Sequence, residues 1–181
     1  MPAFANSDRL RRFSNAMVIV TSIGMVVIAV AMCLVFFVPE WTRNLLLARL
    51  GEAGRDLTLT PGRVAAGAAV TAVPVGVLLF GLWQARALFA DFAAGRVFTP
   101  SSVRRLRNFA ACVMAQAALG PLSSTALLIA FTLSNPPGSR QLGIALSTND
   151  YVALIVGGVL LAVAWVMAEA ARIADENASF V

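Results

Sequence analysis

Four long apolar segments constrain the fold of this chain more than any other feature of its sequence. They cover residues 16–38, 64–83, 108–133 and 151–171. Each has the roughly 20 residues that an α-helix needs to cross the hydrocarbon core of a bilayer. Lipid offers no hydrogen bonds to the backbone, and a helix satisfies its own. Glu169 is the one charged residue within them. The sequence therefore predicts an all-α membrane protein, a bundle of four transmembrane helices in a single domain (1–181).

The composition agrees with a membrane protein. Apolar residues make up 59% of the chain and charged residues only 13%, and the mean hydropathy is +0.81. A soluble domain is about half apolar and a quarter charged. A net charge of +5 would fit a nucleic-acid binder, but beside membrane helices arginine marks the cytoplasmic side and the anionic headgroups. We therefore expect no direct nucleic acid binding.

The arginines also predict an orientation. Nine of them fall in the N-terminal stretch, the 84–107 loop and the C-terminal tail, and five in the other two loops. Positive residues concentrate on the cytoplasmic side. Both termini and the 84–107 loop are therefore predicted to be cytoplasmic.

The second and third helices are predicted to extend past the membrane into a cytoplasmic helical hairpin. Apolar residues continue at helical spacing after Trp83, and polar residues are expected elsewhere on the helix. The apolar positions are Ala85, Leu88, Phe89 and Phe92; the polar ones are Gln84, Arg86 and Asp91. Gly95 is a typical C-terminal stop, and Thr99-Pro100 is a typical helix start.

This hairpin is the predicted contact site for a protein partner or for anionic lipid. The proposed contact residues are Phe98, Arg104, Arg105 and Arg107. The alternative is that these arginines only set the topology and reach to lipid phosphates.

Other signals place the remaining boundaries. Thr60-Pro61 predicts the start of the second helix, and Asn149-Asp150 is expected to cap the fourth. In the first loop, residues 44–50 read as a short helix along the outer membrane surface, stopped by Gly51.

The sequence predicts no catalytic, cofactor-binding or metal-binding residue, and we expect no enzyme activity. There is no His, which removes the His-based nucleophile schemes and His-ligated metals. Cys33 and Cys112 lie at depths that differ by about 20 Å at 1.5 Å per residue, too far for a disulfide. Glu169 is expected to pair with Arg172, and Gln116 to bond a neighbouring helix.

Small residues recur at four-residue spacing in three of the segments. Such spacing lets membrane helices approach closely, so these positions are predicted to pack helix against helix, within the chain or in a homodimer. They are Ala68, Ala72, Gly76, Gly120, Ser124, Ala153, Gly157, Gly158 and Ala162.

Two stretches carry a resemblance to a known family. Residues 88–99 (LFADFAAGRVFT) are similar to the hairpin of the bacterial four-helix membrane proteins known as domain of unknown function 2975, and residues 169–177 (EAARIADEN) to their acidic tail. The resemblance implies the four-helix fold and a location in a bacterial inner membrane, but no activity. Family members often neighbour small helix-turn-helix regulators, which implies a regulatory pairing.

We therefore expect a non-enzymatic membrane protein that acts by interaction, as a regulatory or accessory partner through its basic hairpin. Two alternatives stay open at this point. One is an accessory or structural subunit of a larger membrane complex. The other is a small transporter or channel, which needs a polar path that only Gln116, Glu169 and a few hydroxyl residues could supply.

Overall fold

The computed structural model describes residues 3–50, 60–132 and 146–178, and within these ranges the chain is helical, with no strand. The helices are α1 (Ala3–Phe37), α2 (Pro39–Leu50), α3 (Pro61–Ala93), α4 (Pro100–Thr132) and α5 (Thr148–Ala178). In the described part of the chain, α1, α3, α4 and α5 are long and apolar enough to cross a membrane. The described residues of the four predicted apolar segments lie in these helices, except Val38, which follows the end of α1. Leu133 lies outside the described residues. The four helices indicate an integral membrane protein.

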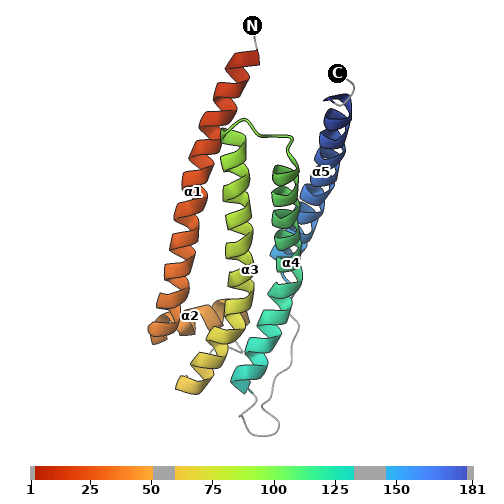
Figure 1. Ribbon diagram of the computed structural model, residues 1–181. Coiled ribbons are helices and arrows are strands. Elements are labelled where there is room, and N and C mark those ends of the chain that lie inside the picture. Colours follow the sequence, from red (N-terminus) through yellow and green to blue (C-terminus); the bar gives the residue numbers. More distant parts are fainter. Residues whose placement is uncertain (1–2, 51–59, 133–145, 179–181) are drawn as a thin grey trace.

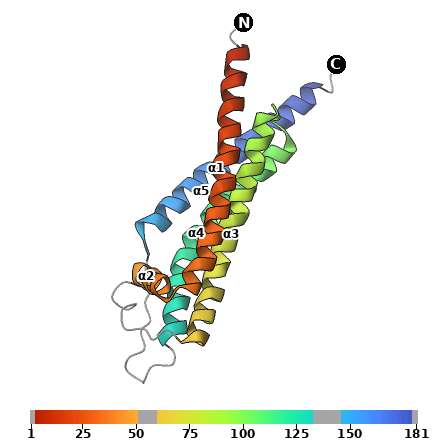
Figure 2. The same cartoon turned by 90° about the vertical axis from the view of Figure 1, so that its left-hand side faces the viewer.

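The four long helices stand in an open row rather than around a common axis (Figure 1). The main contacts join α1 to α3, α3 to α4 and α4 to α5. Figure 2 shows that α5 is inclined to the other three. The outer helices, α1 and α5, are therefore not packed on each other as they would be in a closed four-helix bundle.

Three chain features meet at one end of the row, which we call the turn end because it holds residues 94–99. The N-terminus of α1, the turn from α3 to α4 and the C-terminus of α5 all lie there, and α2 lies near the opposite end (Figure 1). This arrangement arises because the chain reverses direction from each long helix to the next, so every second helix end lies on the same side.

Helix starts follow local capping rules, with one correction. Both α3 and α4 begin at the predicted prolines. The Thr60 side chain forms no capping bond, whereas Thr99 Oγ1 accepts the Ser102 N–H at 3.3 Å. The predicted cap of α5 at Asn149-Asp150 was wrong. Ser147 caps this helix, because its N–H donates to Asp150 Oδ2 at 2.9 Å while its Oγ accepts the Asp150 N–H at 3.3 Å.

The short helix α2 begins earlier than residues 44–50 predicted, at Pro39. Proline suits the first helical position because its fixed φ and missing N–H cost nothing there. Thr42 is buried and its Oγ1 donates to the Val35 carbonyl at 2.6 Å, which ties α2 to the end of α1. The predicted stop at Gly51 lies outside the described residues.

A small apolar core joins three helices near the turn end. Leu88 of α3, Leu106 of α4 and Ala164 of α5 are buried together, and Phe92, Leu160 and Met167 pack around them. Gln84 and Asp91 are also buried, although the sequence pattern predicted them on the polar side of the helix, away from Leu88. Asp91 follows Leu88 by three residues, so both lie on the same side of the helix.

Candidate functional site

The turn from α3 to α4 is closed by backbone hydrogen bonds. Gly95 has a φ of +77°, a left-handed conformation that glycine adopts without strain. The Gly95 N–H donates to the Phe92 carbonyl at 3.0 Å, and the Arg96 N–H donates to the Asp91 carbonyl at 2.9 Å. These two bonds form a Schellman motif. The predicted stop at Gly95 is therefore confirmed, and the direction in which α4 leaves the turn is set locally.

The Asp91 carboxylate is the centre of a polar cluster beneath this turn. Its side chain is only 4% exposed. Oδ1 accepts Arg96 Nη2 at 2.8 Å, and Oδ2 accepts Arg105 Nη1 at 2.7 Å. Two arginines, one from the turn and one from α4, therefore compensate a carboxylate that would be unfavourable to bury alone. We define the turn cluster as Asp91, Arg96, Thr99, Ser102 and Arg105.

Hydroxyl groups complete the turn cluster. Ser102 is fully buried and its Oγ donates to the Arg96 carbonyl at 2.8 Å. The same oxygen lies 2.9 Å from Thr99 Oγ1 and 3.4 Å from Asp91 Oδ2. The polar atoms of the turn are thus bonded to one another, which keeps its backbone in one conformation.

The three neighbouring arginines of α4 do not share one role. Arg105 turns inward, where its Nη1 also donates to the Ala87 carbonyl at 2.6 Å. Arg104 and Arg107 are exposed and line a groove between α4 and α5 together with Arg172. The predicted contact set therefore divides, with Arg105 in the turn cluster and Arg104 and Arg107 on the surface. Phe98 in the turn is 60% exposed.

Asp91 was missed as a candidate by reasoning from the sequence. The sequence did contain a signal for a buried ion pair. Asp91 follows the apolar Leu88 by three residues, so both lie on the same face of the helix. Arg96 comes five residues after Asp91, just past the glycine that ends the helix. The arginine from α4 that pairs with it could not be chosen in the same way, because three arginines lie within four residues.

A second polar contact joins α1 to α3. Arg86 Nε donates to Ser22 Oγ at 2.8 Å. One turn further along α3, the ring of Phe89 meets the ring of Phe13 edge-on, with centroids 6.3 Å apart. Together these contacts set the register of α1 along α3.

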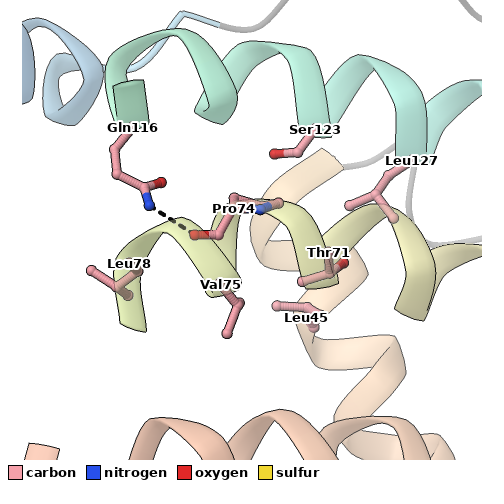
Figure 3. Close-up of a pocket in the computed structure, with 8 residues that line it drawn as sticks. All are labelled: Leu45, Thr71, Pro74, Val75, Leu78, Gln116, Ser123 and Leu127. Atoms are coloured by element: carbon pink, nitrogen blue, oxygen red, sulfur yellow. Dashed lines mark hydrogen bonds between the residues drawn. The ribbon is translucent and has the colours of Figure 1, made fainter. Parts of the chain in front are cut away.

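A cavity of about 70 Å³ lies between α2, α3 and α4, away from the turn end. Its residues include Leu45, Thr71, Pro74, Gln116 and Ser123 (Figure 3). Gln116 Nε2 donates to the Pro74 carbonyl at 2.8 Å, so the predicted bond from Gln116 to a neighbouring helix is present. Thr71 and Ser123 donate to carbonyls of their own helices at 2.8 and 2.9 Å. The cavity has room for a few water molecules.

The small residues predicted to pack helices fall into two groups. Gly157 and Gly120 lie at contacts between helices. A Cβ on Gly157 would meet Met114 and the Ala110 carbonyl, and a Cβ on Gly120 would meet the Asp150 carboxylate. Ser124 is buried. Gly76 and Gly158 have open space beside them. Ala72 and Ala162 are exposed, and Ala68 and Ala153 are half-buried. The spacing did not predict Gly81 as a packing residue. A Cβ added to Gly81 would lie 3.0 Å from Cys112 Cβ.

Two ion pairs lie near the end of α5. Glu169 Oε1 pairs with Arg172 Nη2 at 2.5 Å, as predicted, and Glu176 Oε1 pairs with Arg172 Nη1 at 2.7 Å. Cys33 and Cys112 are free. No three residues of the His, Cys, Asp or Glu types come together in the described ranges in a way that could hold a metal ion.

Comparison with known proteins identifies a family but no activity. The sequence model of one family, described as a protein of unknown function (DUF2975), matches residues 36–181. The match includes both stretches that carried the resemblance, residues 88–99 and 169–177. No curated protein and no solved structure matches the chain.

Proposed function

This chain belongs to the DUF2975 family of proteins of unknown function, and from that premise we propose that it is a non-enzymatic integral membrane protein that acts by interaction. The interaction surface is the basic turn end, and the role is that of a regulatory or accessory partner. We place the protein in a bacterial inner membrane with both termini and the turn in the cytoplasm. The excess of arginine in the segments that meet at the turn end supports this orientation.

The observation that carries the proposal is that Arg105 points inward and is hydrogen-bonded, whereas its neighbours Arg104 and Arg107 are exposed. Arg105 is bound by the turn cluster, so the fold accounts for it. Arg104 and Arg107 form no ion pair with any described residue, and both are exposed. They stand on a helix whose start is held by the turn cluster, and Phe98, in the turn that leads into this helix, is exposed as well. A rigid surface that combines guanidinium groups with an aromatic ring has the composition of a protein contact site.

The test compares two pairs of arginines at the turn end. The Arg104→Ala/Arg107→Ala variant removes the proposed contact, and Arg9→Ala/Arg12→Ala removes the same charge from exposed positions of α1. Each is expressed at native level, extracted in mild detergent and analysed for proteins that co-purify. We expect the first variant to lose a partner that the wild type and the second variant retain. Equal recovery from all three forms, with topology intact, would contradict the proposal.

An accessory subunit of a larger membrane complex is the second candidate, and the open row of helices favours it. Since α1 and α5 are packed mainly on one neighbour each, both have free sides for helices of another chain. Stoichiometric co-purification with other membrane proteins would support this role. Elution as a small monomer or dimer in the mildest detergents would argue against it.

A further inference from the structure

The groove between α4 and α5 at the turn end has a shape that neither helix makes alone. Its volume is about 370 Å³, and its lining combines Arg104, Arg107 and Arg172 with Val103, Ala168 and Ala171. Cationic groups therefore come from both helices, and the floor between them is apolar.

The packing of α5 explains why space is left there. The backbones of α4 and α5 come close together at Gly157, where an added Cβ would lie 2.8 Å from the Met114 nitrogen. Further along α5 the contact continues through Ala164, which is buried in the small core. Because α5 is inclined to α4 (Figure 2) and carries only alanines at 168 and 171, no large side chain fills the gap beyond the core.

The charges in the groove favour an anionic occupant. Arg172 is held by Glu169 and Glu176, so it shapes the wall and brings little net charge. Arg104 and Arg107 are without an ion pair among the described residues. They are three residues apart on α4, which places their Cβ atoms about 5–6 Å apart on one face. Two uncompensated guanidinium groups at this spacing can bind the oxygens of one phosphate group together.

The position of the groove along α5 favours a lipid as the source of that phosphate. Trp165 is 63% exposed, and exposed tryptophan in a membrane helix prefers the headgroup level. Arg172 lies two turns further towards the turn end, about 10 Å along the helix axis. From this position we expect the guanidinium groups at the phosphate layer, and Val103 and Ala168 at the depth of the glycerol and the first acyl carbons.

We infer that the groove between α4 and α5 binds the phosphate headgroup of an anionic glycerophospholipid through Arg104 and Arg107. The lipid site goes beyond the proposed function, although both use the turn end and its two exposed arginines as a contact surface. It differs in its ligand, which is a lipid rather than a protein. In a membrane, a lipid bound in this groove would fix the depth and orientation of the turn end relative to the headgroups.

The experiment measures lipid selectivity on purified protein, without any protein partner. Delipidated wild type in detergent is titrated with phosphatidylglycerol and with phosphatidylcholine of the same acyl chains, and bound lipid is counted by native mass spectrometry. We expect a preference of about thirtyfold for phosphatidylglycerol, in line with two arginines near an anionic headgroup. Arg104→Ala/Arg107→Ala should remove the preference, and Arg9→Ala/Arg12→Ala should retain it.

A second variant tests the groove rather than the charge. Ala168→Leu fills the apolar floor and leaves every arginine in place, so it should lower phosphatidylglycerol binding severalfold while helix content stays unchanged. Unchanged binding by this variant would overturn the inference in favour of diffuse surface attraction. Competition by inorganic phosphate at concentrations equal to those of the lipid would also overturn it, since the site would then take any phosphate.

The outcomes separate the lipid site from the proposed function. If Arg104→Ala/Arg107→Ala loses a protein partner but keeps its phosphatidylglycerol preference, the lipid site is overturned and the protein contact stands. If the preference is lost and wild-type cells yield no partner sensitive to these arginines, the lipid site is supported and the protein contact fails.

Discussion

Arg105 of α4 and Asp91 of α3 form an ion pair across the turn, with Nη1 and Oδ2 2.7 Å apart. The carboxylate is nearly buried, with 4% of the side chain exposed, whereas 32% of the Arg105 side chain is exposed. The pair therefore lies at the edge of the core, where the protein screens it from solvent on one side only. It holds the ends of two long helices together and leaves the neighbouring arginines on the surface.

Replacing Asp91 with Asn should destabilise the protein although the side chain keeps its shape. Arg96 and Arg105 would each lose a charged acceptor, and hydrogen bonds to charged groups contribute about 1.5–3 kcal/mol. Because both arginines are partly exposed, we expect a loss of roughly 2 kcal/mol in total. Thermal unfolding in detergent measures it. Asp8→Asn, which removes an exposed carboxylate near the same end, should have no measurable effect, and equal stability of the two variants would contradict this account.

Gly157→Ala and Gly158→Ala form a matched pair that tests the contact between α4 and α5. A Cβ at Gly157 would lie 2.8 Å from the Met114 nitrogen and 3.2 Å from the Ala110 oxygen, whereas a Cβ at Gly158 meets nothing within 4 Å. Backbone atoms cannot move aside cheaply, so Gly157→Ala should cost about 1–3 kcal/mol. Gly158→Ala should be neutral or slightly stabilising. The midpoints of denaturation in mixed micelles distinguish the two, and similar midpoints would show that the helices are not close at Gly157.

Gln116→Leu should have a small effect on stability. The hydrogen bond from Gln116 Nε2 to the Pro74 carbonyl is 2.8 Å long, and such bonds between membrane helices average about 0.6 kcal/mol, with a maximum near 1.7 kcal/mol. Equilibrium unfolding should therefore shift by less than for Asp91→Asn.

The same residue provides a test of the transport alternative. A polar path would have to use Gln116 and Glu169. If purified protein conducts ions in liposomes and the flux survives a Gln116→Ala/Glu169→Ala double change, that path is excluded.

Arg86→Met should loosen α1 from α3. The substitution keeps a long side chain but removes the 2.8 Å hydrogen bond to Ser22 Oγ. Since α1 packs mainly on α3 and the short α2, we expect faster hydrogen exchange of backbone amides in α1 around residue 22. Arg104→Met, at an exposed position without a described ion pair, is the control and should leave this exchange unchanged. The contact has no role in holding α1 if the two variants exchange alike.

The local features of the fold could be predicted from the sequence because they depend on residues close together in the chain. Pro61 and Pro100 begin helices where a missing N–H is harmless, and Gly95 ends one where a left-handed residue is needed. The cap of α5 was misplaced by two residues, because Ser147 and Asp150 stabilise the helix start reciprocally and either could be taken as its first member.

The candidate site was less predictable, and its arginines show why. Arg104, Arg105 and Arg107 look equivalent in the sequence, since each follows the same helix start. Successive residues of a helix point about 100° apart. Only the direction of the neighbouring helix decides which of them turns inward.

The sequence by itself determined that the chain has four apolar segments of membrane-crossing length. It also determined where the turn between α3 and α4 begins and ends. Both depend only on local features, namely segment length, proline and glycine. The tertiary structure alone decided that Asp91 is buried, that Arg105 pairs with it, and that Arg104 and Arg107 stay on the surface of a groove. The physical reason is that the Asp91 carboxylate becomes buried only when the helices pack, and only the packing of α4 on α3 brings Arg105 within hydrogen-bonding distance of it.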